Sequence, residues 1–157
     1  AEGKPVTNAK YVVVLNGLEE KERFGQIITP LIFSPDSKRL AYKAWSEAQP
    51  SIESGGQSKG SFIVVDGEIG KSYQGIINNP VFSPDSRHIA YLVQQGTLEE
   101  NFTFRSTGEF IVVDGNEGKI YDGVFPYPEI VWSSDSKRIM YWVKTGNELW
   151  WVVDSVE

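Results

Sequence analysis

A ten-residue pattern occurs three times in this chain of 157 residues, and it limits the possible folds more than any other feature. The copies read FSPDSKRLAY at 33–42, FSPDSRHIAY at 82–91 and WSSDSKRIMY at 132–141. An Asn/Asp-Gly pair and a proline recur with them, at spacings of 48 to 50 residues. A motif that recurs once per structural unit indicates a repeat architecture. The sequence therefore predicts one repeat domain, 1–157, with units at about 11–60, 61–108 and 109–157.

The units are expected to consist of β-strands. The segments RLAYKAW, HIAYLV and RIMYWV are rich in β-branched and aromatic residues, and helical periodicity is absent. We expect a strand A before Ser-Pro-Asp, a strand B through the tyrosine, and a Val-rich strand C before Asp-Gly. Strand D is expected in KSYQGI or KIYDGV. A partial unit is expected to precede the first full one, with a strand C at 11–15 and a strand D near 23–28. Four short antiparallel strands per repeat are typical of a β-propeller blade, so the predicted fold class is an all-β propeller with about three blades per chain.

The repeated motif is interpreted as a turn. Proline presets φ for the second position of a tight turn, and an aspartate there can accept hydrogen bonds from nearby backbone N–H groups. The alternative is that Asp36, Asp85 and Asp135 bind a cation or act in acid–base catalysis. That alternative has less support, because equivalent residues of successive blades would be spread around a ring and would not converge on one substrate.

The motif copies FSPDSKRLAY and FSPDSRHIAY are each joined to a hairpin such as VVDGEIGKSYQGI. In these residues the chain resembles the WD40-like PD40 repeats of TolB-type periplasmic proteins and of the propeller domains of prolyl-oligopeptidase-like peptidases. The resemblance covers about residues 11–154. It implies a propeller that serves as a binding platform or as a gate to a catalytic domain, and it favours a periplasmic or secreted location. No catalytic residue is carried over, because the shared motif is structural.

Three repeats are fewer than the 4–8 blades, approximately, that close a propeller. We expect two chains to join about a two-fold axis, because three blades of roughly 60° each cover half of a six-bladed ring. The alternative is that the chain is a piece of a longer propeller. The last unit is unusually aromatic, and exposed aromatic surface at an open sheet edge favours association. The predicted dimer interface comprises Tyr11, Val13, Trp142, Trp150 and Trp151.

Two long connections between strands B and C, at 46–60 and 94–108, are expected on one loop-rich face. Connections of this length in a compact domain are often functional. The second one carries aromatic and basic side chains that suit a protein or peptide partner. The predicted contact residues are Phe102, Phe104 and Arg105 from this loop, with Asn78, Asn79 and Tyr127 from the connections that precede strand A.

The sequence predicts no enzyme, cofactor or metal site. Its one histidine, His88, stands where the other copies have Arg39 and Arg138, and there is no cysteine. A serine–histidine–aspartate triad, a zinc-ligand spacing and a phosphate-binding glycine loop are all missing. The net charge of −6 and scattered basic residues do not suit a nucleic-acid partner, and no apolar run is long enough for a membrane span.

The predicted function is therefore a non-enzymatic propeller module that homodimerises and binds a protein, peptide or small ligand at its loop-rich face. The alternatives are a hydrolase with a carboxylate site at the propeller axis, and a fragment of a larger propeller such as a peptidase gating domain.

Overall fold

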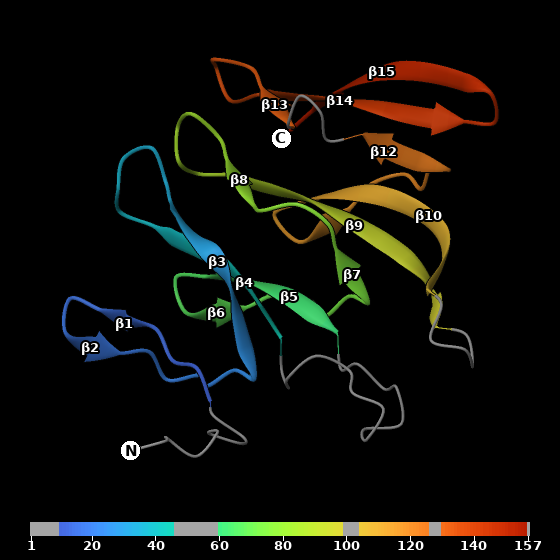
Figure 1. Cartoon of the computed structure of the whole chain (residues 1–157). Coiled ribbons are helices and arrows are strands. Elements are labelled where there is room, and N and C mark those ends of the chain that lie inside the picture. Colours follow the sequence, from blue (N-terminus) through green and yellow to red (C-terminus); the bar gives the residue numbers. More distant parts are fainter. Residues whose placement is uncertain (1–9, 46–59, 99–103, 126–129, 157) are drawn as a thin grey trace.

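The computed structural model describes residues 10–45, 60–98, 104–125 and 130–156, and all of its regular elements are β-strands. These strands form four antiparallel sheets. The sheets lie beside one another in chain order, so the first and the last are at opposite ends of the row (Figure 1). The predicted all-β fold is confirmed. Within the described residues there is no helix that could cross a membrane.

A short N-terminal hairpin precedes three larger sheets. The hairpin consists of β1 (Val14–Leu15) and β2 (Leu18–Glu19). Sheet 1 contains β3 (Gln26–Phe33), β4 (Leu40–Trp45), β5 (Ser61–Val65) and β6 (Glu68–Ile69). Sheet 2 contains β7 (Gly75–Ile76), β8 (Val81–Phe82), β9 (Ile89–Leu98), β10 (Phe104–Val113) and β11 (Asn116–Glu117). Sheet 3 contains β12 (Gly123–Phe125), β13 (Val131–Trp132), β14 (Arg138–Thr145) and β15 (Glu148–Ser155).

The repeated motif connects the first two strands of each sheet, as the sequence predicts. In sheet 1 it ends β3, forms a turn and continues into β4. In sheets 2 and 3 the first strand is in two pieces, and both pieces pair with the same second strand. The motif therefore marks one sheet per copy.

The Asn/Asp-Gly pairs form the predicted hairpin turns. They connect β1 to β2, β5 to β6 and β10 to β11. In each pair both residues have positive φ, for example 54° at Asp66 and 83° at Gly67. Two positive φ values are characteristic of a type I′ turn, whose twist matches that of the flanking strands. Aspartate and asparagine tolerate this conformation better than most residues with a Cβ atom.

The predicted strand D is wrong in its boundaries. Within KSYQGI, Tyr73 pairs with Ser61 of sheet 1, whereas Gly75–Ile76 pairs with β9 of sheet 2. Tyr121 and β12 divide in the same way between sheets 2 and 3. The strand D expected near 23–28 is also wrong, because its second half is the start of β3. The chain thus passes directly from the last strand of one sheet into the first strand of the next.

The predicted loop at 94–108 is also wrong where the structure describes it. Strand β9 continues to Leu98, and β10 begins at Phe104 and pairs with it, with one irregularity between Ser106 and Gly108. A polar sequence forms strand here because backbone pairing across a hairpin does not require apolar side chains. Of the loop predicted at 46–60, all but the last residue lies outside the described residues.

The core lies between successive sheets. Each sheet has an upstream face, which packs against the preceding sheet or hairpin, and a downstream face, which packs against the following sheet. Ile63 on the downstream face of sheet 1 packs among Ile76, Ile89 and Tyr91 of sheet 2. Ile111 of sheet 2 packs in the same way among residues of sheet 3. Sheets covered on both faces explain why apolar residues occupy both sides of the strands.

Candidate functional site

The aspartate of the repeated motif is held inside its own turn. In the first copy, Ser34 Oγ donates a hydrogen bond to Asp36 Oδ1 over 2.7 Å, and the Lys38 N–H donates to the same oxygen over 3.2 Å. Ser34 Oγ also accepts the Arg39 N–H over 3.0 Å, which closes the turn onto β4. Equivalent bonds occur in the other two copies. The structural interpretation of these aspartates is thus supported.

These hydrogen bonds lower the pKa of all three aspartates. The largest cause in each case is the serine hydroxyl two residues before, followed by a backbone N–H group two residues after. Hydrogen bonds to a carboxylate favour its charged form. The three groups therefore stay ionised at neutral pH and serve as hydrogen-bond acceptors in the turn. A general acid would instead need a pKa raised toward neutral pH.

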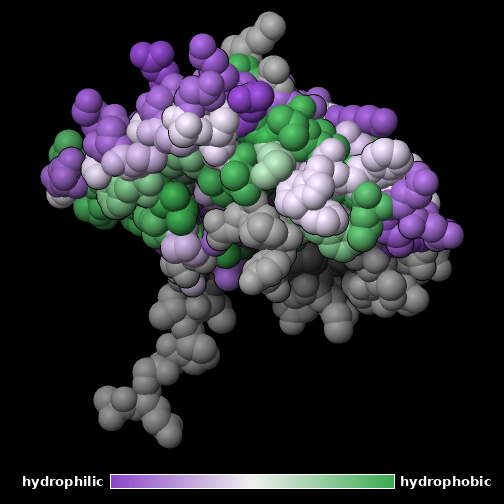
Figure 2. All heavy atoms as spheres, turned by 90° about the horizontal axis from the view of Figure 1, so that it is seen from above, coloured by the Kyte–Doolittle hydropathy of each residue, from purple (hydrophilic) through white to green (hydrophobic). Residues whose placement is uncertain are grey.

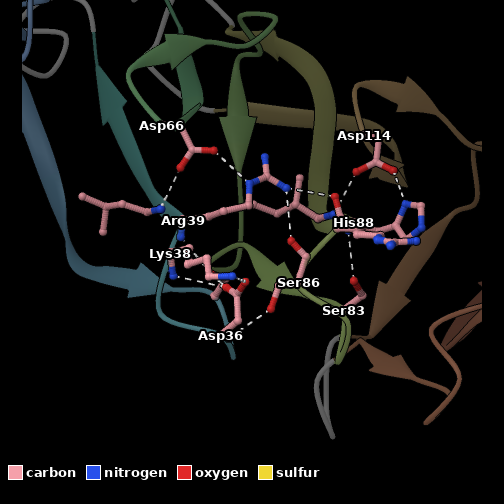
Figure 3. Close-up of polar contacts among 12 residues, drawn as sticks. Asp36, Lys38, Arg39, Asp66, Ser83, Ser86, His88 and Asp114 are labelled. Atoms are coloured by element: carbon pink, nitrogen blue, oxygen red, sulfur yellow. Dashed lines mark hydrogen bonds and ion pairs between the residues drawn. The ribbon is translucent and has the colours of Figure 1, made fainter.

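Successive turns are connected to each other across the sheets (Figure 3). The Asp36 N–H donates to Ser86 Oγ of the next motif copy over 3.0 Å. Arg39 Nε donates to Asp66 Oδ2 over 2.8 Å, and Asp66 Oδ1 accepts the Leu40 N–H. Arg39 Nη1 also reaches the backbone carbonyl of Ser86. The residues shared by the copies thus bind one sheet to the next.

His88 takes the place of this arginine in sheet 2. Its Nδ1 lies 2.7 Å from Asp114 Oδ2, and Asp114 Oδ1 accepts the Ile89 N–H (Figure 3). Its ring stacks on Trp132 of sheet 3, with centroids 5.9 Å apart. This position corresponds to that of Arg39, whose guanidinium lies over the ring of Phe82 at 5.5 Å. His88 therefore serves as part of the framework between sheets.

The residues predicted to contact a ligand do not form one described cluster. Asn78 is half-buried, and its Oδ1 accepts the Leu92 N–H over 2.7 Å, which is a structural role. Asn79 is exposed on the connection before β8, and Arg105 is exposed on β10. Phe104 is the first residue of β10, and its side chain is not described. Phe102 and Tyr127 lie outside the described residues.

A cleft of about 300 Å³ lies between the connection at 71–74 and sheet 2, and it includes Gln94 and Gln95 of β9. One wall is formed by Lys71, whose Nζ pairs with Glu117 Oε1 at 2.6 Å and lies over the ring of Tyr73. The same lysine-over-tyrosine contact recurs in the next unit. Because the arrangement repeats, it belongs to the framework and does not single out a ligand. The described residues contain no group of three or more His, Asp or Glu side chains suited to a metal ion.

The feature that does not repeat is the downstream face of sheet 3. No further sheet covers it among the described residues, and we call it the open face. Trp151 is 48% exposed there, whereas the equivalent Ile63 and Ile111 are each 2% exposed. The register places the apolar residues of this face in adjacent rows: Val131, Met140 and Val153 in one, Phe125, Trp142 and Trp151 in the next, and Leu149 beyond them.

Figure 2 looks onto this end of the molecule from above and shows hydrophobic residues gathered beside near-neutral ones, with hydrophilic residues around them. The rings of Trp142 and Trp151 lie 4.2 Å apart and form the centre of the open face. The indole N–H of Trp142 is buried without a hydrogen-bond partner among the described residues. An apolar face of this kind, with edge strand β15 beside it, is suited to contact with another protein surface.

Among the described residues, sheet 3 also has no counterpart of the short fourth strand that β6 and β11 provide in the other sheets. Asp154 occupies the position of Asp66 and Asp114, but Ser155 follows it instead of glycine, and β15 continues. Asp154 Oδ2 accepts a hydrogen bond from the Tyr141 hydroxyl over 2.6 Å. The outer edge of β15 is therefore unpaired within the described chain.

The residues predicted for a dimer interface are divided by the structure. Trp142 and Trp151 lie on the open face, and Trp150 is exposed on the opposite side of β15. Tyr11 is half-exposed beside the N-terminal hairpin. Val13 is buried against Phe24 and residues of β4, so in this arrangement it offers no surface to a partner.

Comparison with known proteins identifies no family: no family model matches the chain, and no curated protein matches it.

Proposed function

We propose that the chain is a non-enzymatic interaction module of the β-propeller type, which associates with a second copy of itself through the open face. The observation that carries this proposal is the exposure of Trp151 and its neighbours at positions that are buried in the other two sheets. A second part of the proposal is that the assembled module binds a protein, peptide or small ligand at the end where the β9–β10 hairpin extends.

Covering the open face contributes a hydrophobic driving force for association. Burying the exposed half of Trp151 removes on the order of 100 Å² of mainly apolar surface from water, which contributes about 2–3 kcal/mol. The adjacent Leu149 and Val153 are at least as exposed and add to this. Aromatic residues at the centre of a patch typically dominate the energy of an interface.

The test is the solution mass of the wild-type chain and of two variants, measured by light scattering over a range of concentrations. We expect the wild type to have twice the chain mass of 17.6 kDa. Trp151→Lys should give the mass of one chain, because it places a charge at the centre of the open face. Ile120→Lys is the matched control, since Ile120 is 52% exposed but lies away from this face. A wild type that remains a single chain at high concentration would overturn the proposal.

The same observation supports one alternative, in which the module belongs to a longer propeller and a following sheet of the same polypeptide covers the open face. The resemblance to peptidase propeller domains agrees with this alternative. A single-chain mass for the isolated module, together with association when a polypeptide carrying further repeats is added, would favour it.

A further inference from the structure

Three extended segments that precede an Asn/Asp-Gly turn are paired along their outer edge in the same way. In each one, a residue near the start of the segment exchanges two backbone hydrogen bonds of 2.7–2.9 Å with an aromatic residue that follows the turn. The pairs are Tyr11 with Phe24, Ser61 with Tyr73, and Glu109 with Tyr121. The outer edge therefore has a regular partner wherever the structure shows it covered.

A second hydrogen bond repeats farther along the same edge. The Gly70 N–H donates to the Ile63 carbonyl over 2.9 Å, and the Gly118 N–H donates to the Ile111 carbonyl over 2.8 Å. A Cβ atom at these glycines would lie 2.9 and 3.0 Å from the same carbonyl oxygens, so glycine permits the close approach of the two backbones. The covering segments of sheets 1 and 2 thus share a glycine and, three residues later, a tyrosine, in GKSY at 70–73 and GKIY at 118–121.

Strand β15 presents the same edge without a partner. Its register with β14 matches that of β10 with β9, and Leu149 occupies the position of Glu109. Backbone groups alternate in direction along an antiparallel strand, so those of Leu149 and Trp151 point to the outer edge. Within the described part of the chain, β15 pairs with β14 alone.

The side chains beside this edge are apolar and exposed. Leu149 is 58% exposed, and Trp151 is exposed next to it on the open face. In the covered interface, Tyr73 is buried and packs in the same cluster as Ile63, which occupies the position of Trp151. A segment of the same kind on β15 would therefore place its aromatic ring beside Leu149 and Trp151 and cover part of the open face.

We propose that the outer edge of β15 binds an extended segment of a partner protein as an antiparallel strand. The segment places an aromatic residue opposite Leu149, and a glycine three residues earlier donates its N–H to the Trp151 carbonyl. In strand addition of this kind, main-chain hydrogen bonds supply affinity and alternate side chains supply specificity. The chain's own Gly-Lys-x-Tyr segments already pair with β5 and β10, so a partner supplies the segment. The site does not depend on self-association, because a covering segment and a following sheet are present together in the interface of sheets 1 and 2.

The test uses the full chain, isotope-labelled for NMR, and a capped peptide with the sequence of residues 68–75, EIGKSYQG. The peptide is titrated to millimolar concentration, at a protein concentration at which light scattering gives the mass of one chain. We expect saturable shifts of the backbone amide signals along β15. Hydrogen exchange of the Leu149 N–H should become slower, because this group gains an acceptor, whereas the Trp150 N–H faces β14 and should be unaffected.

Two N-methylated peptides serve as a matched pair. Methylation of the tyrosine nitrogen removes the donor to the Leu149 carbonyl and should weaken binding about tenfold. Methylation of the next nitrogen, that of glutamine, should change binding less than about twofold, because this nitrogen points away from the paired strand. A peptide with alanine in place of tyrosine should also bind severalfold more weakly, since it covers less of the open face.

Equal binding of the two methylated peptides would overturn the proposal, as would shifts centred on the outer edge of β11 or the lack of any saturable shift. Unchanged binding of the alanine peptide would contradict the preference for an aromatic residue. A wild type that remains a single chain at high concentration would overturn the proposed self-association but would leave this site intact.

Discussion

The hydrogen bond between neighbouring turns offers a sharp test of how the sheets hold together. Ser86→Ala removes the hydroxyl oxygen that accepts the Asp36 N–H over 3.0 Å. Its matched control is Ser37→Ala, at the equivalent position of the first copy, where the serine is exposed. The two serines have nearly the same backbone conformation, with φ of 66° and 60°. Any cost of placing alanine in the left-handed region is therefore common to both variants.

The expected magnitude follows from burial. Ser86 is almost fully buried, so the N–H group that loses its acceptor is left poorly solvated. An unsatisfied buried donor costs about 1–3 kcal/mol. Because the Asp36–Ser86 bond is only partly buried, we expect the lower part of this range, about 1–1.5 kcal/mol. Ser37→Ala should change the free energy of unfolding by less than about 0.5 kcal/mol beyond the shared backbone cost.

The assay is urea unfolding followed by tryptophan fluorescence, at a concentration at which light scattering gives the mass of one chain. This condition keeps association between chains from contributing to the measured free energy of unfolding. If Ser86→Ala and Ser37→Ala destabilise the single chain equally, the bond between turns contributes nothing, and the reasoning from the repeated contacts is wrong.

Two further outcomes follow from the same framework. Gly108→Ala should lower the free energy of unfolding by about 2 kcal/mol more than Gly123→Ala, measured by urea unfolding. At Gly108, φ is 151°, and a Cβ atom would overlap Ile120 Cγ2 and lie 3.0 Å from the Tyr121 carbonyl oxygen, whereas at Gly123 the nearest atom is 3.8 Å away. Equal costs would show that the backbone at Gly108 is not tightly enclosed. Acid should destabilise the chain, because the hydrogen bond from Ser83 lowers the pKa of Asp85 from its ordinary value of 3.8 and equivalent bonds do so in the other copies. A depressed folded-state pKa means that this stability is present above 3.8 and is lost as the pH falls through the folded-state value. Asp85→Asn should therefore lose less stability than the wild type in this acid range, and parallel pH profiles would contradict this.

The sequence predicts the parts of the fold that depend on local chemistry. The turn at Ser34 and the hairpin at Asp66 form where they are expected. A short polar side chain hydrogen-bonds within the first turn, and a glycine adopts positive φ in the second without strain. Strand D could not be placed in the same way. Tyr73 and Gly75 are two residues apart and have similar surroundings in sequence, yet they pair with different sheets.

The candidate site shows the same division. The sequence predicted that the tryptophans of the last unit form a surface to be covered, because that unit is unusually rich in aromatic residues. It could not separate Trp151, which is exposed, from Val13, which is buried, because burial depends on which sheet packs against each strand. The exposure of Phe33 and Ser37 also could not be predicted, because the same residue types are buried at the equivalent positions of the next copy.

The sequence by itself determined the repeat, its period and its turns, since these depend on residues that lie close together along the chain. Only the tertiary structure decided which copies of each repeated residue are covered. Ile111 and Trp151 occupy the same position in their sheets, but a following sheet packs against the first and none of the described chain packs against the second. Hydrophobic burial depends on neighbours that are distant in sequence, so the surface available to a partner emerges only when the sheets are assembled.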